Sequence, residues 1–276
     1  MKRIFLAIFS IAMLASCNQS GQQNQPAKDG AKQDTPRETE KVRKPLSFSG
    51  AFYQITNMGS PDIVFTEGDY SIEAEGPARL LNAVNIEVDS HVLTVSIKNE
   101  ENFGTNQFSS APSRITLYVS CPSLQILAVC GTGNFKSVGP IHTPDIQIGM
   151  LGTGNLELDS VFTTGSFSYE SSGDGNAIFQ HIRSAHECNF MISGAGSTTA
   201  DVDVAEQLLM HNDHTGNVVI SGKANTADLI ILGESNCVAD FDADQLHLTA
   251  LYGNVTLNGK YRQKEVQQGK KAIITN

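Results

Sequence analysis

The sequence predicts an all-β fold, a single-stranded, right-handed parallel β-helix with irregular coils at its N-terminal end. Three observations support this prediction: a turn motif recurs seven times, its copies lie 18 to 21 residues apart, and apolar residues alternate with polar ones between them. Periods near 20 residues are typical of coils that stack on one another, and parallel crossovers favour the right-handed turn. The motif has the form Gly-x-Gly-Asn, and its copies end at Asn134, Asn155, Asn176, Ser197, Asn217, Asn236 and Asn254.

The alternation inside each repeat indicates strands rather than helices, because side chains on a strand point to opposite faces in turn. Two mostly apolar positions recur after each motif, and we expect them to form interior columns: Phe135, Leu156, Ala177, Thr198, Val218, Cys237 and Val255 in one, and Ser137, Leu158, Phe179, Ala200, Ile220, Ala239 and Leu257 in the other. Two further columns are expected on the returning strand: Ile146, Phe167, Cys188, Leu209, Leu229 and Leu248, and Ile148, Tyr169, Phe190, His211, Ile231 and Ala250.

The motif itself is interpreted as the corner of each coil. Corners often need a positive φ, which glycine adopts freely and asparagine better than most residues. Asparagines stacked at the spacing of neighbouring strands, about 4.8 Å, are also expected to hydrogen-bond to one another in a ladder. The alternative is an anion-binding nest of glycine amides, but a motif present in every coil favours the structural role.

The N-terminal residues have the features of a lipoprotein signal. Lys2 and Arg3 precede an apolar run, residues 4–14, that is too short to cross a bilayer as a helix. The tetrapeptide LASC at 14–17 resembles a bacterial lipobox, in which the signal is cut before the cysteine and that cysteine is lipidated. We therefore predict a signal peptide at 1–16 and lipid attachment at Cys17, with an ordinary signal peptide as the alternative.

Residues 18–44 are polar, with few apolar side chains, and therefore predict a disordered tether. The folded domain is expected over 45–276. Strands are expected at 51–56, 62–66, 70–74, 85–88, 92–98 and 114–120, a helical turn or two at 77–84, and a loop at 100–113. No repeat is visible in this opening part, which we interpret as irregular coils that cap the stack, because the terminal units of such arrays are atypical.

The composition excludes some partners. The net charge of −10 argues against nucleic acid, whose phosphates would be repelled. Four cysteines follow Cys17: Cys121, Cys130, Cys188 and Cys237. The segment between Cys121 and Cys130 looks mostly extended, and Cys188 and Cys237 occupy different columns, so we expect four free thiols.

Many polysaccharide-cleaving enzymes use parallel β-helices, so paired carboxylates are the candidate catalytic residues. The D-x-D pairs are Asp201 with Asp203, and Asp240, Asp242 and Asp244. They are interpreted as solvated acids near strand ends, because no basic or aromatic cluster joins them in the sequence. Histidine pairs with ligand-like spacing, His181 with His186 and His211 with His214, are expected to point apart. The sequence therefore predicts no catalytic, cofactor-binding or metal-binding residues and no cofactor.

Taken together, several features resemble the head GIN domain family of auto-transporter adhesins: the lipobox, the polar tether, the segment FSGAFYQITNMGSPDIVFTEGDYSIEAEG, the segment RITLYVSCPSLQILAVCGTGN and the serial Gly-x-Gly-Asn turns. The similarity covers about residues 46–258, and Ser197, Ser235, His214 and Leu251 depart from the motif. The resemblance implies a right-handed parallel β-helix and a cell-envelope location. It supplies no catalytic residues.

The expected function is that of a non-enzymatic, lipid-anchored cell-envelope module that binds a protein or a glycan. The alternative is a carbohydrate-active enzyme, a lyase or hydrolase, on the same scaffold. We expect attachment to the outer membrane through Cys17. The residues after it, Asn18 to Gly21, lack the acidic pair that resembles a surface-export signal, which favours the periplasmic face. The oligomeric state stays open.

Overall fold

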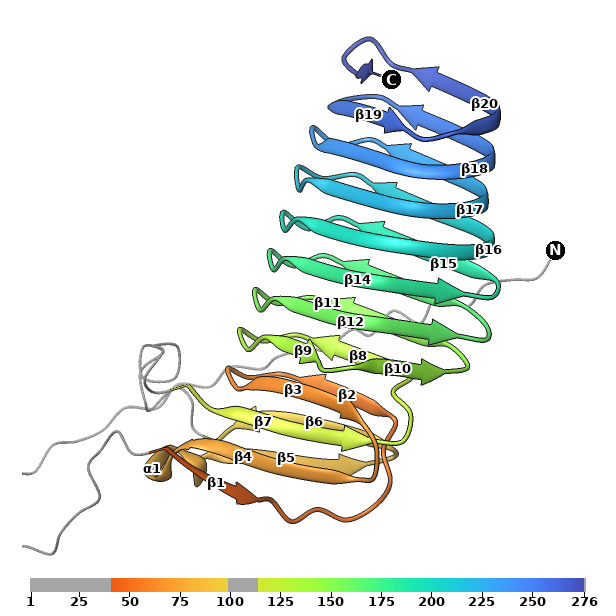
Figure 1. Ribbon diagram of the computed structural model, residues 1–276. Helices are drawn as coiled ribbons and strands as arrows, with labels where there is room; N and C mark the ends of the chain where they lie inside the picture. Colours follow the sequence, from red (N-terminus) through yellow and green to blue (C-terminus); the bar gives the residue numbers. More distant parts are fainter. Residues whose placement is uncertain (1–40, 99–113, 276) are drawn as a thin grey trace, which may run out of the picture. The chain divides into compact units, whose positions relative to one another are not determined.

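The computed structural model describes residues 41–98 and 114–275, which lie within one compact unit. Nearly all of the secondary structure is β, and the strands form a parallel solenoid of about eight turns, which confirms the predicted fold class (Figure 1). The predicted signal peptide, Cys17, the tether as far as residue 40 and the loop at 100–113 lie outside the described residues.

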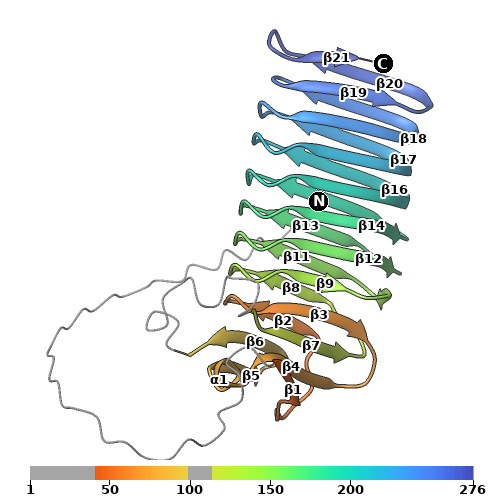
Figure 2. The same cartoon turned by 60° about the vertical axis from the view of Figure 1, so that its left-hand side comes forward.

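From residue 126 onward, successive coils pair in parallel register. Figure 2 shows the stack from a second side, with β20 and β21 at the end opposite β1. The strands of this part are β8 (Ile126–Val129), β9 (Phe135–Ser137), β10 (Pro140–Thr143), β11 (Ile146–Met150), β12 (Leu156–Thr163), β13 (Phe167–Ser171), β14 (Ala177–Ser184), β15 (Glu187–Ile192), β16 (Thr198–Asn212), β17 (Val218–Ile231), β18 (Asn236–Ala250), β19 (Asn254–Asn258), β20 (Tyr261–Gln268) and β21 (Ile273–Thr275).

The first two predicted interior columns are confirmed. Leu156 pairs with Ala177 and Leu158 with Phe179, and the same columns continue to Val255 and Leu257 at the other end of the stack. Their members are buried. Like positions therefore stack on like positions through every coil, which is the physical basis of the repeat in the sequence.

The columns of the returning strand shift in register from β16 onward. In β17 and β18 the predicted Leu229, Ile231, Leu248 and Ala250 are buried, but each lies one column away from the predicted one; only in β16 are the predicted residues not buried. This strand buries Leu208 and Met210, whereas the sequence predicted Leu209 and His211, which lie on its outer side. The cause is a register shift between β14 and β16 at the bend ahead of this segment, where the later coil has one residue fewer.

The corner glycines serve close approach between coils and not positive φ, which corrects the expectation from the sequence. Of the motif glycines only Gly253 has a positive φ, at +76°, and no described asparagine has one. A Cβ built on Gly173 would lie 2.0 Å from the carbonyl oxygen of Gly152, and one on Gly175 would lie 1.9 Å from that of Gly154. Ordinary contacts begin near 3.4 Å, so no side chain fits between the stacked corners.

The predicted asparagine ladder is present on the same edge. The backbone N–H and the side-chain amide of Asn155 both donate to Oδ1 of Asn134, at 2.9 and 3.2 Å. Asn176 donates to Asn155 in the same way, and the backbone N–H of Ser197 donates to Asn176 at 3.0 Å. Within the described residues no bond joins the Ser197 side chain to Asn217, and the ladder resumes in the last three copies.

The opening segment caps the stack, but its order in space differs from its order in the chain. Strand β2 lies between β6 and β8, and β3 lies between β7 and β9. The chain thus runs from β1 at the outer end to β2 and β3 farther inside the stack, and then returns outward through β4, α1 and β5. The elements are β1 (Lys41–Pro45), β2 (Gln54–Asn57), β3 (Asp62–Glu67), β4 (Ser71–Pro77), α1 (Ala78–Leu81), β5 (Val84–Asp89), β6 (Val92–Ile97) and β7 (Thr116–Cys121).

Strand β1 begins four residues before the predicted domain boundary at residue 45. Strand β1 runs antiparallel to β4, and its charged side chains explain why a polar segment is ordered here. Arg43 donates to Glu73 at 2.7 Å and lies 3.7 Å from the ring centroid of Tyr118, while Lys44 donates to Asn82 at 3.2 Å. The polar composition that predicted disorder therefore reflects an exposed edge strand.

The four described cysteines are free, as the sequence predicted. The expectation of one extended strand was wrong in detail, because the chain leaves β7 at Cys121 and turns before β8 begins. Cys121, Cys188 and Cys237 are buried, and Cys130 is exposed at a corner. Burial raises the pKa of the Cys121 thiol to about 11 and that of Cys237 to about 12.

Four of the fully buried aromatic side chains gather in the middle coils. Phe167, Tyr169, Phe179 and Phe190 are fully buried, and their ring centroids lie 4.9 to 6.0 Å apart. Aromatic pairs at these distances contribute beyond their buried area, by about 0.5–1.5 kcal/mol each. The outward-facing residues of the same coils therefore lie on strands whose inner faces are tightly packed.

Candidate functional site: an outward column beside a groove

Each coil bends midway along its forward strand, and the bend arranges one set of outward side chains in a row. In β12 the alternation of buried and exposed residues is interrupted at positions 159 and 160. Beyond the bend, His142 stacks on Phe162, Phe162 on Arg183, Arg183 on Asp203 and Asp203 on Lys223. These five residues are called the groove column.

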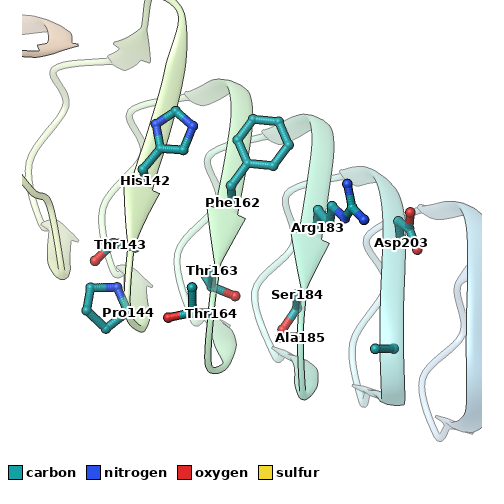
Figure 3. A pocket seen from close by; sticks show the side chains of 11 residues that line it. His142, Thr143, Pro144, Phe162, Thr163, Thr164, Arg183, Ser184, Ala185 and Asp203 are labelled. Carbon is teal, nitrogen blue, oxygen red and sulfur yellow. The ribbon is translucent and has the colours of Figure 1, made fainter.

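The first four members of the groove column line a groove of about 590 Å³. Figure 3 shows their side chains in a row, with the corner residues of the same coils on the other side. A volume of this size falls in the range of small-molecule sites, about 300–1,000 Å³, which are lined mainly by apolar groups with a few polar ones. The corner residues are Thr143, Pro144, Thr163, Thr164, Ser184, Ala185 and Ala205.

Two aromatic rings form the apolar part of the row. The rings of His142 and Phe162 are stacked, with centroids 5.2 Å apart and planes at 17°. On its other side Phe162 meets the edge of His181, at 6.1 Å and 62°. Phe162 is partly exposed, although the outward positions of these coils are mostly polar. The ring of Phe162 adds apolar surface to the lining of the groove.

The charged part of the row contains one cation without a partner. Asp203 forms an ion pair with Lys223, with Oδ2 and Nζ 3.3 Å apart. His142 is held from the preceding coil, where Glu67 accepts from its backbone N–H and lies 3.3 Å from Nδ1. The side chain of Arg183, by contrast, forms no ion pair or hydrogen bond with any residue in the described ranges. Its exposed guanidinium offers five N–H donors.

The acidic runs are held by neighbouring coils and lie within the continuous strands β16 and β18, not at strand ends as expected. Asp201 contacts His181 Nδ1 at 2.8 Å and accepts from Ser221 Oγ at 3.0 Å. Asp242 accepts the backbone N–H of residue 260 at 2.8 Å, and Asp244 pairs with Arg262. These carboxylates therefore hold adjacent coils together.

Histidines repeatedly face carboxylates across adjacent coils. Such pairs place a ring nitrogen 2.6 to 3.3 Å from an acidic oxygen; they are His142–Glu67, His181–Asp201, His186–Glu206 and His247–Asp228. His181 and His186 thus turn to different acids. Within 41–98 and 114–275 no group of three or more His, Cys, Asp or Glu side chains is placed to hold a metal ion. In the same ranges no helix is long and apolar enough to cross a membrane.

Sequence reasoning missed this groove. It concluded that no basic or aromatic residues join the acidic pairs, and the structure corrects this, because Phe162 and Arg183 lie in one row with Asp203. The signal was present at the repeat period: these residues lie 20 and 21 positions apart. Only the apolar positions of successive repeats had been compared, whereas these side chains lie at outward positions. The predicted lipid-attachment residue, Cys17, lies outside the described residues.

Two segments of the sequence match models of known families. Residues 51–184 match the model of the family described as "Putative auto-transporter adhesin, head GIN domain". Residues 1–18 match the prokaryotic membrane lipoprotein lipid attachment site. No curated protein matches the chain.

Solved structures of similar fold cover most of the chain. One is a protein from Parabacteroides distasonis described as a "putative adhesin". It is 17% identical to this chain, with a TM-score of 0.61, and the alignment covers 87% of this chain and 98% of that one. One from Bacteroides fragilis is 14% identical with a TM-score of 0.57, covering 86% and 97%. A second Parabacteroides distasonis protein, named as a lipid-binding protein, is 16% identical with a TM-score of 0.53, covering 86% and 97%. At these identities the likeness concerns the fold alone.

The match over residues 51–184 confirms the resemblance inferred from the sequence, which is to the head GIN domain family of auto-transporter adhesins.

Proposed function

We propose that this protein is a lipid-anchored cell-envelope module that binds a glycan in the groove and carries out no chemistry. The observation that supports this most directly is the row formed by Phe162 and Arg183. It combines an exposed aromatic ring with a guanidinium that has no partner in the described residues. Small-molecule sites combine an apolar surface with a few polar groups, and these two side chains provide both.

The shape of the groove favours a glycan over a protein. Its volume suits a short oligosaccharide, and its lining mixes a ring, threonine methyl groups and a few charged groups. Protein interfaces bury about 800 Å² on each partner, an area larger than a single groove of this kind provides. A protein ligand is the alternative that the experiment below distinguishes. A lipid, suggested by the name of one structural relative, is tested in the same experiment.

The contacts of the acids support a binding role over catalysis. A glycosidase needs two carboxylates that flank the bond to be broken, about 5 to 9.5 Å apart. In the groove only Asp203 is available, and it is paired with Lys223. Asp201 is occupied by His181 and Ser221. The family description as an adhesin points the same way.

The anchoring part of the proposal rests on the N-terminal match to a lipid attachment site. We assign the lipid to Cys17, after removal of residues 1–16 as a signal peptide. Residues 18–40 would then act as a tether that reaches roughly 25 Å as a flexible chain. We place the protein at the outer membrane, with the periplasmic face favoured by the absence of acidic residues at 18–21.

A glycan array probed with the fragment 37–276 tests the proposal. Phe162→Ala and Arg183→Gln should each abolish the signal, because they remove the ring and the free donor. The controls Ile178→Ala and Lys136→Gln alter exposed residues on another face of the stack and should leave it unchanged. A signal that survives both groove variants, or one seen only with lipid or protein probes, would contradict the proposal. The bound glycan should keep its chain length, and its shortening would favour the enzyme.

A further inference from the structure

The C-terminal coil carries a charge opposite to that of the rest of the protein. Residues 259–276 contain five basic residues and one acidic residue, a net charge of +4 in a chain whose net charge is −10. Such an asymmetry between parts of one chain indicates an interaction surface for an anionic partner. The basic residues are Lys260, Arg262, Lys264, Lys270 and Lys271.

This coil forms the outer end of the stack. Among the described residues, β20 pairs only with β18 and β21 only with β19, so one side of each strand faces away from the solenoid. The register places Lys264 over Leu246 and Val266 over Leu248, at positions that are buried and apolar in the coils below. Here both side chains are exposed. The basic groups therefore lie on and around an open end face.

The opposite end of the stack is closed in another way. There α1 buries Leu80 and Leu81 against the core, and β1 covers the edge of β4 in antiparallel pairing. That end contains no comparable excess of positive charge, because acidic residues such as Glu73 and Glu75 accompany the basic residues of β1. An excess of basic side chains is thus specific to the C-terminal end.

The positive charge of this end face is only weakly compensated. Arg262 pairs with Asp244 at 3.2 Å, but its side chain is 81% exposed, and exposed pairs of this kind contribute little. Within the described residues Lys260 and Lys270 have no acidic partner. Lys271 lies 5.4 Å from the ring centroid of Tyr252, and Lys264 lies 5.8 Å from that of Tyr261. Aromatic rings beside ammonium groups suit a ligand with both anionic groups and sugar rings.

From these observations we propose that the end face formed by β20 and the turn at 269–272 binds an acidic polysaccharide. This site is separate from the groove, which lies several coils away along the stack (Figure 1). The proposal does not depend on the function assigned to the groove. The rings of Tyr252 and Tyr261 beside the lysines favour a polymer of acidic sugars over an anionic lipid surface.

Binding of the full-length protein, purified in neutral detergent, to immobilised polygalacturonate tests this inference. The double variant Lys270→Gln/Lys271→Gln should weaken binding about tenfold or more at low salt, because each lysine beside an anionic surface contributes roughly a factor of five. Binding of the wild type should fall steeply as salt is raised. The single variant Lys260→Gln offers a second change at an exposed side chain, with a smaller loss expected.

The matched control is Lys41→Gln/Lys136→Gln, which removes two exposed lysines, one on β1 at the other end of the stack and one paired with Glu157 in the middle coils. It should bind polygalacturonate like the wild type, and uncharged dextran should not bind. Equal losses in both double variants would show a dependence on total charge and would overturn the proposal. So would stronger binding to duplex DNA or to phosphatidylglycerol vesicles than to polygalacturonate. An effect of the Lys270/Lys271 change on solubility alone would show that these lysines only prevent edge-to-edge aggregation, and would also overturn it.

Discussion

Replacement of a single corner glycine by alanine should destabilise the solenoid far more than the size of a methyl group suggests. In Gly173→Ala the new Cβ would lie 2.0 Å from the carbonyl oxygen of Gly152 and 2.8 Å from the carbonyl carbon of Leu151. Ordinary contact begins near 3.4 Å, so the two corners must separate by about 1.4 Å. Both neighbours are backbone atoms of a stacked coil, and neither can rotate away.

The cost follows from what that separation disrupts. Overpacking of this kind costs typically 1–3 kcal/mol. The amides of Ser172 and Gly173 both donate to Met150 O, at 2.9 and 3.0 Å, and loss of one such bond adds about 1 kcal/mol. A total near 3 kcal/mol should lower the midpoint of thermal unfolding by about 6–12 °C for a unit of this size.

The assay is far-ultraviolet circular dichroism of the fragment 37–276 during heating. The control is Gly68→Ala, because Gly68 has an ordinary φ and a Cβ added there would meet no atom within 4 Å. It should unfold within about 2 °C of the wild type, or slightly higher through reduced entropy of the unfolded chain. Equal midpoints for the two variants would refute the view that close approach between corners requires glycine.

Three further predictions concern the ladder, the thiols and the anchor. Ser197→Asn should restore the interrupted ladder and raise the free energy of unfolding by about 0.5–1.5 kcal/mol, measured by urea denaturation; no gain would show that the gap is inherent in the shorter coil. In the folded fragment 37–276 only the exposed Cys130 should react promptly with a thiol reagent, and four thiols should react in denaturant, whereas a count of two or none would reveal a disulfide. The pKa of Cys237 in the folded protein, about 12, exceeds the ordinary value of 9.0. The protonated thiol therefore contributes its full stabilisation below pH 9, and the free energy of unfolding should fall as the pH rises from 9 toward 12. Cys17→Ala should leave the full-length chain uncleaved or released from membranes, checked by mass spectrometry of the mature N-terminus; a mature chain with unmodified Cys17 and cleavage elsewhere would refute the lipid assignment.

The sequence predicted the fold because stacking repeats the same environment every coil. Leu156 and Ala177 occupy equivalent positions, so the period was visible without any knowledge of contacts. The register failed where the repeat shortens inside a coil. Two residues separate Phe179 from Ile182, but only one separates their partners Ala200 and Val202. Counting from the corner therefore misplaced the following strand by one residue.

The opening segment shows another limit of sequence reasoning. Its strands were largely predicted, but nothing in their composition indicated that β2 would lie between β6 and β8. That order depends on long-range pairing rather than on local preference. The groove escaped prediction for a related reason. Phe162 and Arg183 do not stand out when each strand is considered by itself, and they form a site only because coils stack in register.

The central claim is that the groove is a binding site without catalytic chemistry, and a calorimetric titration tests it most directly. A glycan identified on the array is titrated into fragment 37–276, into the double variant Phe162→Ala/Arg183→Gln and into the control Ile178→Ala/Lys136→Gln. We expect one site per chain, with no heat from turnover after saturation. The groove variant should lose binding by 100-fold or more, about 2.7 kcal/mol, and the control should match the wild type. Unchanged binding in the groove variant, or continuing heat from glycan cleavage, would contradict this claim.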